Sequence, residues 1–308
     1  MTSRGGVGVE SVRAKQAHYE RFCASHPLKT ADVLDATWRY IDSGAGARTL
    51  LMIHGVAGEA TGFYRMIESF QGEYRAIVPT FPALNTMDGV CRGCKGLLDE
   101  AGVGPVVLFG ASWGGMVAQA FLHRYPERVE AVILADTSGP NPASARRNAQ
   151  QSRVLGFVPW WLARRLFQVG IKRLLKVRGD LTEEQETELR FQRSRLDVRL
   201  ADLSKELLFA QSRAAYDLLN DVSYTAEDFR AWPGKMLVLQ SADDPGLRRG
   251  EDTYALDTRY PGAKVITMHG AGHLGLVLRH DDYVREINSF LVGLPKPDRD
   301  LQRPQSLA

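Results

Sequence analysis

The sequence is poor in cysteine, in net charge and in nucleotide-binding motifs, and each shortage excludes a class of protein. Three cysteines among 308 residues are too few for a disulfide framework, so a reducing, cytoplasmic location is expected. The 39 basic and 36 acidic residues leave a net charge of +3, too small to indicate a nucleic-acid partner. No apolar signal-peptide core is found in residues 1–16. A content of 44% hydrophobic and 24% charged residues is that of an ordinary globular protein.

Motifs for cofactors and metals are also missing. No G-x-G-x-x-G follows an expected strand and no G-x-x-x-x-G-K occurs, so we expect no cofactor. Cys91-Arg-Gly-Cys94 has no second pair of ligands, so packing thiols are favoured over a metal or redox site, and no metal is expected. The uncharged stretch 101–122 is long enough to span a membrane, but five glycines and a proline favour a strand, a turn and a buried helix.

Short β-rich runs alternate with segments long enough for a helix. Near-continuous apolar strands of this kind indicate a mostly parallel sheet with helices on both faces. After Asp136 the alternation stops, and residues 138–228 have only helical patterns, with a capping box at Thr182–Gln185. The expected strands are Trp38–Ile41, Thr49–His54, Arg75–Pro79, Val106–Phe109, Ala131–Ala135, Met236–Gln240 and Lys264–Met268.

We therefore expect one α/β domain with a helical insert. The core comprises residues 36–137 and 229–293, and the insert, residues 138–228, is expected to be a lid over the site. A helical extension over residues 1–35 precedes the core. Residues 294–308 hold three prolines and are expected to form a flexible tail.

The central motif is Gly110-Ala-Ser112-Trp-Gly114, a G-x-S-x-G between an expected strand and an expected helix. In that context the serine hydroxyl projects at the top of the sheet, and the Trp113 N–H faces the reacting oxygen at a helix N-terminus. The glycine turn at His54-Gly-Val56-Ala-Gly58 can direct the Val56 N–H at the same oxyanion. His54 itself is expected to bond the loop backbone rather than act as a base.

A serine nucleophile needs a base, and the chain order Ser…acid…His places that base late in the sequence. Among the seven histidines, His273 lies in a glycine loop after the last strand and is preferred, with His269 as the alternative. The acid is expected after the strand Met236–Gln240. Asp244 is preferred over Asp243 because the residue before a proline is held extended, and Asp136 is the third choice.

Together these residues resemble the α/β-hydrolase superfamily, over about residues 36–293. The resemblance supports Asp244, because the family places its acid just before a residue such as Pro245. Thr80-Phe-Pro-Ala83 departs from the family's usual Asp-x-x-Gly-x-Gly loop. The segments that carry the resemblance are Thr49–Gly58, Gly110–Gly115, Ala131–Thr137, Ser241–Pro245 and Gly270–His273. A closer likeness, to the maspardin-like branch, rests on His54–Tyr64, Phe109–Gly115 and Gln119.

The resemblance implies hydrolysis of a carboxylic ester or related acyl bond in a small-molecule substrate, through an acyl-enzyme intermediate. Ser112 is expected to attack, His273 to move the proton and Asp244 to orient the histidine, while the Val56 and Trp113 N–H groups form the oxyanion hole. Lactone, thioester, amide and C–C bond hydrolysis remain open. The alternative is a binding or scaffold protein without catalysis, because maspardin-like proteins are associated with partners more than with a substrate.

The insert is unusually basic. Residues 144–178 contain nine basic residues and no acid. A helix over 160–176 places Trp160, Leu166 and Phe167 on one face and Arg165 and Lys172 on the other. A lid helix that packs its apolar face over the pocket is favoured over a helix lying on a membrane surface. No feature of the sequence indicates an oligomeric state.

Overall fold

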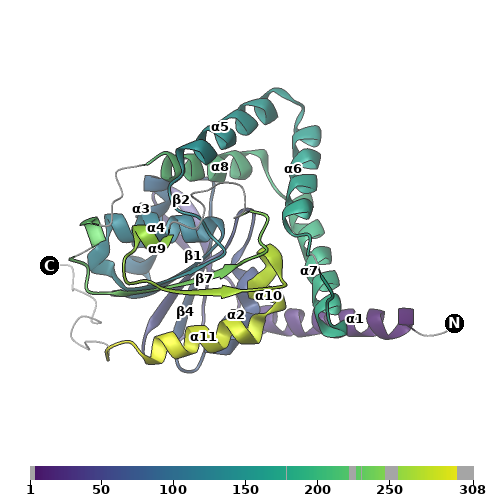
Figure 1. The fold of residues 1–308 in the computed structure, drawn as a ribbon, viewed down its shortest axis with the longest axis horizontal. Coiled ribbons are helices and arrows are strands. Elements are labelled where there is room, and N and C mark those ends of the chain that lie inside the picture. The colour runs from purple at the N-terminus through teal and green to yellow at the C-terminus, as the bar shows by residue number, and fades with distance from the viewer. Residues whose placement is uncertain (1–3, 178, 222–226, 230, 247–255, 297–308) are drawn as a thin grey trace.

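The computed structural model describes residues 4–177, 179–221, 227–229, 231–246 and 256–296. These residues form an eight-stranded sheet with the strand order β1-β2-β4-β3-β5-β6-β7-β8 (Figure 1). The pairs β1–β2 and β2–β4 are antiparallel and the others are parallel, so the predicted mostly parallel sheet is confirmed. The strands are β1 (Lys29–Val33), β2 (Ala36–Asp42), β3 (Thr49–Ile53), β4 (Arg75–Thr80), β5 (Val106–Ala111), β6 (Val129–Ala135), β7 (Lys235–Ser241) and β8 (Lys264–Met268).

The N-terminal extension is only partly helical. Helix α1 (Arg4–Ser25) forms as expected, but residues 29–33 are the edge strand β1, paired antiparallel with β2. The expectation of a helical extension over residues 1–35 was therefore wrong for this strand. Leu34 and Asp35 make the two-residue turn with φ of 53° and 57°, values that Asn-Gly pairs adopt more readily. Without such a pair, nothing in the sequence marked the hairpin.

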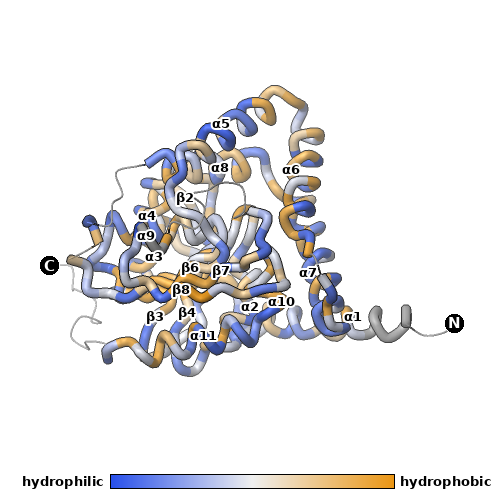
Figure 2. Tube along the Cα trace, viewed as in Figure 1, coloured by the Kyte–Doolittle hydropathy of each residue, from blue (hydrophilic) through white to orange (hydrophobic). Residues whose placement is uncertain are grey.

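Side chains of the central strands alternate between two cores, one on each face of the sheet. Leu51 and Ile53 face the core that includes α3 (Met87–Glu100), α4 (Trp113–Arg124) and α9 (Leu256–Arg259). Leu50 and Met52 face the core that includes α1, α2 (Tyr64–Phe70) and α11 (His280–Val292). Figure 2 shows the apolar strands between these layers. Burial on both faces explains why the strands are almost continuously apolar.

The segment between β6 and β7 is helical, as predicted. It contains α5 (Pro142–Phe157), α6 (Trp160–Leu174), α7 (Glu183–Ala201) and α8 (Lys205–Asn220). The predicted capping box at Thr182 and Gln185 begins α7. In Figure 1, α5 and α6 meet at a corner away from the sheet, and α7 returns towards α1. Leu200, Leu203 and Leu208 pack with Ala57, so the insert contacts the loop after β3.

Two further expectations concern the chain ends and membranes. Leu294, expected in the flexible tail, is only 9% exposed and packs in the core beside α11, so the expected tail starts too early. Residues 297–308 of that tail lie outside the described residues. Residues 101–122 contain β5 and most of α4, the predicted strand and helix. Among the described residues, no helix is long and apolar enough to cross a membrane.

Candidate active site

Ser112 lies at a sharp junction between β5 and α4. Its φ of 53° and ψ of −120° are strained for a residue with a side chain, which is typical of a functional turn. The neighbouring glycines are required sterically. A Cβ on Gly110 would lie 2.4 Å from the Gly114 carbonyl oxygen, and one on Gly114 would lie 2.0 Å from the Ile53 carbonyl oxygen. The motif therefore holds the serine where β3 and β5 end.

Three predicted residues meet at the carboxyl ends of the strands. His273 Nε2 lies 2.9 Å from Ser112 Oγ, and His273 Nδ1 lies 2.6 Å from Asp244 Oδ2. The Asp244 side chain is fully buried, and its other oxygen accepts the Gly246 N–H at 2.7 Å. The three side chains come from loops that follow β5, β7 and β8. Serine, imidazole and carboxylate thus form one hydrogen-bonded row, the arrangement of a nucleophile with its base and orienting acid.

The alternative residues at this edge have other partners. Asp243 accepts the Gly270 N–H at 3.1 Å and the Gly272 N–H at 3.0 Å, so it holds the loop that carries His273. The carbonyl of His269 accepts a bond from Arg279 at 2.9 Å. These contacts place Asp243 and His269 beside the row of side chains but outside it.

Asp136 lies behind the row, after β6. One of its oxygens accepts the Ser241 N–H at 2.8 Å and the other accepts the Tyr283 hydroxyl at 2.9 Å. Burial raises the pKa of Asp136 to about 6. Burial alone lowers the pKa of His273, but the hydrogen bond and charge of Asp244, with the charge of Asp136, outweigh it and raise that pKa. The two carboxyl groups therefore favour the imidazolium that forms when His273 takes a proton.

His54 has a structural place, as expected. Its ring is buried, and Nδ1 hydrogen-bonds the Gly55 carbonyl at 2.8 Å. Burial lowers the pKa of His54 to about 4, so the ring is neutral at pH 7. Phe81, from the segment that departs from the family pattern, lies edge-on to His54 at 5.3 Å and to Trp113 at 5.2 Å between ring centroids. An aromatic side chain therefore occupies the space beside the loop that follows β3.

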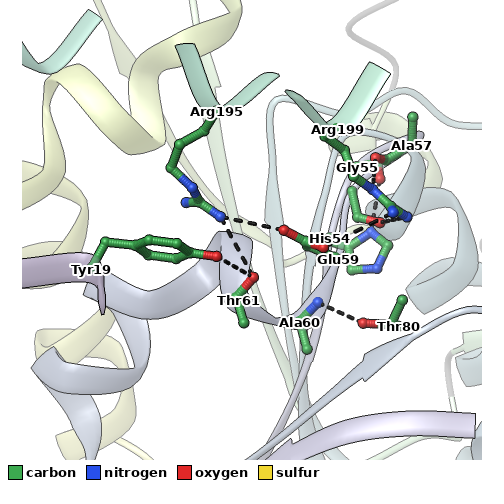
Figure 3. Close-up of polar contacts among 11 residues, drawn as sticks. Tyr19, His54, Gly55, Ala57, Glu59, Ala60, Thr61, Thr80, Arg195 and Arg199 are labelled. Carbon is green, nitrogen blue, oxygen red and sulfur yellow. Dashed lines mark hydrogen bonds and ion pairs between the residues drawn. The ribbon is translucent and has the colours of Figure 1, made fainter. Parts of the chain in front are cut away.

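Two arginines of α7 hold the loop after β3, residues 54–61 (Figure 3). Arg199 donates to the Ala57 carbonyl at 3.0 Å and to the Gly58 carbonyl at 3.1 Å. Arg195 lies 3.4 Å from a Glu59 oxygen and stacks over the Tyr19 ring at 3.6 Å. Because a guanidinium presents several fixed donors, these contacts define where the loop lies relative to the insert.

Gln211 of α8 binds the same loop. Its Oε1 accepts the Ala57 N–H at 2.9 Å, and its backbone carbonyl accepts the Trp113 indole N–H at 3.0 Å. Because an amide N–H can only donate, the atom facing Ala57 is the oxygen. Gln211 Nε2 is buried and has no hydrogen-bond partner within the described part of the chain. No sequence signal pointed to Gln211 or Arg199, because a polar residue on an amphipathic helix has no distinctive pattern.

Val56, Ser112 and Trp113 share the wall of one cavity of about 380 Å³. In the structure as described, neither the backbone N–H of Val56 nor the backbone N–H of Trp113 donates a hydrogen bond to another group. Both donors are thus available beside the serine. The rest of the described lining, from α4, α5, α6 and α8, is apolar or neutral: Met116, Asn148, Gln151, Ser152, Leu155, Phe167, Leu174, Leu208, Phe209, Gln211, Ser212 and Ala215.

The C-x-x-C pair lies elsewhere. Cys91 and Cys94 are fully buried on α3 within the core, as expected if they are packing thiols. Burial raises the pKa of Cys91 to about 12, so this thiol is unreactive at neutral pH. The cytoplasmic location expected from the cysteine content stays a prediction.

Comparison with known proteins identifies the family of this chain. Residues 50–287 match the model of the alpha/beta hydrolase family, so the chain belongs to that family. It is 38% identical over 118 residues to the 2-hydroxy-6-oxononadienedioate/2-hydroxy-6-oxononatrienedioate hydrolase of Paraburkholderia phymatum, covering 33% of this chain and 41% of that protein. It is 25% identical over 315 residues to the sn-1-specific diacylglycerol lipase ABHD11 of Mus musculus, covering 94% and 96%.

A solved structure shows the same fold. The esterase from Thermogutta terrifontis superposes with a TM-score of 0.65 at 22% identity, covering 86% of this chain and 98% of the esterase. The matches to the bacterial hydrolases cover less of the relatives: the chain spans 41% and 49% of the length of two of them. These relatives bear the names of hydrolases and a lipase. The maspardin-like likeness stays a prediction.

Proposed function

We propose that this protein is a serine hydrolase that cleaves a carboxylic ester or a related acyl bond without a cofactor. The observation that carries the proposal is the hydrogen-bonded row of Ser112, His273 and Asp244, with Ser112 in the wall of the cavity. A protein that only binds a partner has no need to keep these three groups within hydrogen-bond distance. We therefore prefer catalysis to the binding or scaffold alternative.

In the first half-reaction, Ser112 Oγ attacks the carbonyl carbon while His273 Nε2 takes the hydroxyl proton. Asp244 stabilises the imidazolium through Nδ1. The carbonyl oxygen becomes an oxyanion, which accepts hydrogen bonds from the backbone N–H groups of Val56 and Trp113. One such donor contributes about 3 kcal/mol in a serine protease of a different fold. The C–O bond then breaks, and the leaving alkoxide takes the proton from His273 Nε2. An alcohol departs and the acyl group stays on Ser112.

In the second half-reaction, water replaces the alcohol. His273 Nε2 takes a proton from the water as its oxygen attacks the acyl carbon, and a second oxyanion forms in the same hole. When the bond to Ser112 Oγ breaks, His273 returns the proton to the serine. The products are a carboxylic acid and the free enzyme, so no electrons are exchanged and no cofactor is consumed.

The cavity lining favours an uncharged acyl group. None of the described residues that line it is charged. The dienedioate in the name of the Paraburkholderia relative carries two carboxylates, whereas a diacylglycerol is neutral. Burying a carboxylate without a cationic partner is costly. We therefore propose a neutral ester as substrate, and C–C bond hydrolysis as the second candidate reaction, favoured by the 38% identity over 118 residues.

We further propose that residues 138–228 form the lid of the core. Leu155 of α5, Phe167 of α6 and Leu208 of α8 line the cavity, so these helices form part of its wall. Removing Phe167 should change which acyl groups fit. Phe167→Ser is therefore expected to alter the ratio of kcat/KM between short and long acyl esters.

The test is a set of p-nitrophenyl esters with short, medium and carboxylate-terminated acyl chains, together with a dienedioate for C–C cleavage. Uncharged esters should be cleaved at least about tenfold faster than the charged one, because the charge must be desolvated. Ser112→Ala should fold and lose activity on the order of 10⁶-fold, as in other serine triads. Ser289→Ala, at an exposed serine of α11, is the matched control and should retain activity. Full turnover by Ser112→Ala would contradict the proposal.

A further inference from the structure

The outer faces of α5 and α6 expose an unusual amount of apolar surface. Ten large apolar side chains are exposed in the described part of the chain, and five of them lie on these two helices. Phe157 is 90% exposed and Trp161 is 64% exposed. Val154, Leu166 and Val169 complete the set, which we call the outer apolar patch. Exposed apolar side chains that gather on one pair of helices, rather than being scattered singly over the surface, usually mark an interaction site.

The patch is separate from the apolar face that covers the cavity. Phe167 and Leu174 line the cavity and Ala163 is buried, so α6 already has an apolar inner face. Leu166 was expected on that inner face but is 48% exposed. At 3.6 residues per turn, Trp161, Arg165 and Val169 follow one another along the opposite, exposed side. The helix therefore has a second apolar surface that the cavity does not explain.

Positive charge is interleaved with the patch. The sequence has no acidic residue between Asp136 and Asp180. Lys172 pairs with Asp197 at 2.7 Å, so part of its charge is compensated. The exposed basic residues of the two helices are Arg146, Arg147, Arg153, Arg165, Lys172 and Arg173. In Figure 2, apolar and polar positions alternate along α6, and Figure 1 shows both helices at the corner away from the sheet.

We propose that this face of α5 and α6 docks on the surface of an anionic lipid bilayer. Aromatic side chains such as Phe157 and Trp161 sit well at the boundary between headgroups and acyl chains, and cations beside them attract anionic headgroups. A second copy of the chain is disfavoured, because a symmetric contact at this face would bring two strongly basic surfaces together. A single-stranded nucleic acid would find only Phe157 and Trp161 to stack on, whereas the aliphatic Val154, Leu166 and Val169 suit an acyl-chain environment, so lipid is favoured over that partner as well.

Docking would place the cavity next to the membrane. Leu155 and Phe167 line the cavity from the inner sides of the same two helices. The lipid surface and the cavity are then separated by the thickness of one helix layer. This docking does not rest on the proposed reaction, because it needs neither Ser112 nor His273, and it can therefore be measured in the Ser112→Ala protein.

The experiment is co-sedimentation of the full-length Ser112→Ala protein with vesicles of neutral phosphatidylcholine, with and without phosphatidylglycerol, at two salt concentrations. We expect binding only to the anionic vesicles, weakened by salt because the charges on both surfaces are screened. The triple change Arg146→Gln, Arg153→Gln and Arg165→Gln should weaken binding on the order of 100-fold, at about 1 kcal/mol per basic residue and 1.4 kcal/mol per tenfold.

Matched controls remove charge and apolar surface elsewhere. The triple change Lys29→Gln, Arg92→Gln and Arg285→Gln takes the same charge from exposed positions outside the insert and should bind like the parent. Phe157→Ser should weaken binding about tenfold, whereas Val292→Ser, at a position 71% exposed on α11, should not. Equal loss in both triple variants would overturn the proposal, since binding would then depend on net charge alone. So would binding to a single-stranded oligonucleotide but not to vesicles.

A second readout does not depend on how the charge variants fold. Brominated acyl chains quench tryptophan fluorescence on contact, and Trp161 lies in the outer apolar patch. Quenching is expected in the parent and should be largely lost in Trp161→Phe, which keeps an apolar ring and should still co-sediment. Binding without any quenching of Trp161 would show that another surface meets the lipid, and would contradict the assignment of this face.

Discussion

Replacing Asp244 by asparagine tests how far the activity depends on one hydrogen bond. The contact between Asp244 Oδ2 and His273 Nδ1 is 2.6 Å, and the carboxylate is fully buried. Its other oxygen accepts the Gly246 N–H, a role that the asparagine oxygen can keep. Asparagine then turns an NH₂ group towards Nδ1. His273 must accept that bond and carry its own proton on Nε2, where it cannot take the serine proton.

The expected loss follows from this change of tautomer. In serine triads an orienting aspartate changed to asparagine lowers kcat by about 10⁴, with the geometry preserved. The free-energy equivalent is about 5.4 kcal/mol, at 1.36 kcal/mol per tenfold. It is larger than the loss of an ordinary neutral hydrogen bond, about 1 kcal/mol, because the base itself is disabled.

The assay is steady-state hydrolysis of a p-nitrophenyl ester, with circular dichroism to confirm folding. Asp243→Asn is the matched control, because it keeps one acceptor for the Gly270 and Gly272 N–H groups and leaves the Asp244 bond untouched. We expect it to cost about tenfold at most, comparable to one hydrogen bond of about 1 kcal/mol. A large loss in Asp243→Asn with a small loss in Asp244→Asn would refute the assignment of the acid.

Three further outcomes are expected. Asp244 and the charge of Asp136 raise the pKa of His273, and the base must be neutral to act. The kcat/KM of the wild type should therefore fall at acidic pH with a midpoint above the usual pKa of a histidine, and Asp136→Asn should move that midpoint to lower pH. A shift to higher pH would contradict the sign. Gln211→Leu leaves the buried Ala57 N–H without its acceptor, so it should destabilise the fold by about 1–3 kcal/mol in urea unfolding and lower kcat. Gln211→Glu keeps the acceptor and should recover part of kcat. Equal kcat in both variants would exclude a positioning role for Gln211. Changing Cys91 and Cys94 together to serine should keep kcat within a few-fold of the wild-type value. The melting temperature should fall, because two buried thiols become hydroxyls. A loss of kcat without unfolding would support the redox interpretation instead.

The main strands were predictable because strands buried on both faces have short, nearly continuous apolar sequences. The strand Val106–Phe109 and the helix after Ser112 were located from a glycine-rich junction that only a strand-to-helix turn requires. Strand β1 was not predictable, because its turn is Leu34-Asp35 and its position is decided by pairing with β2. Turn geometry without glycine or asparagine leaves no local signal.

The three residues of the row at the candidate site were predicted from their order along the chain, because this fold places its serine, acid and histidine in that order. Choosing between Asp243 and Asp244 depended on Pro245, a backbone argument that a local sequence can supply. Contacts across the fold were a different matter. Arg199 and Gln211 reach Ala57 across more than 140 positions, and no periodicity connects residues so far apart. The exposure of Leu166 likewise depended on how α6 sits on its neighbours, which a helical wheel does not determine.

The most direct test of the proposed nucleophile is covalent labelling with a fluorophosphonate, followed by intact-mass measurement and peptide mapping. The hydrogen bond from Ser112 Oγ to His273 Nε2 predicts one adduct per chain, on the peptide that contains Ser112. Ser112→Ala should take up no label, and His273→Ala, which removes the base, should label at least about 10³-fold more slowly. An adduct on any other residue, or a folded wild-type protein that takes up no label, would contradict the assignment of Ser112 as an activated nucleophile.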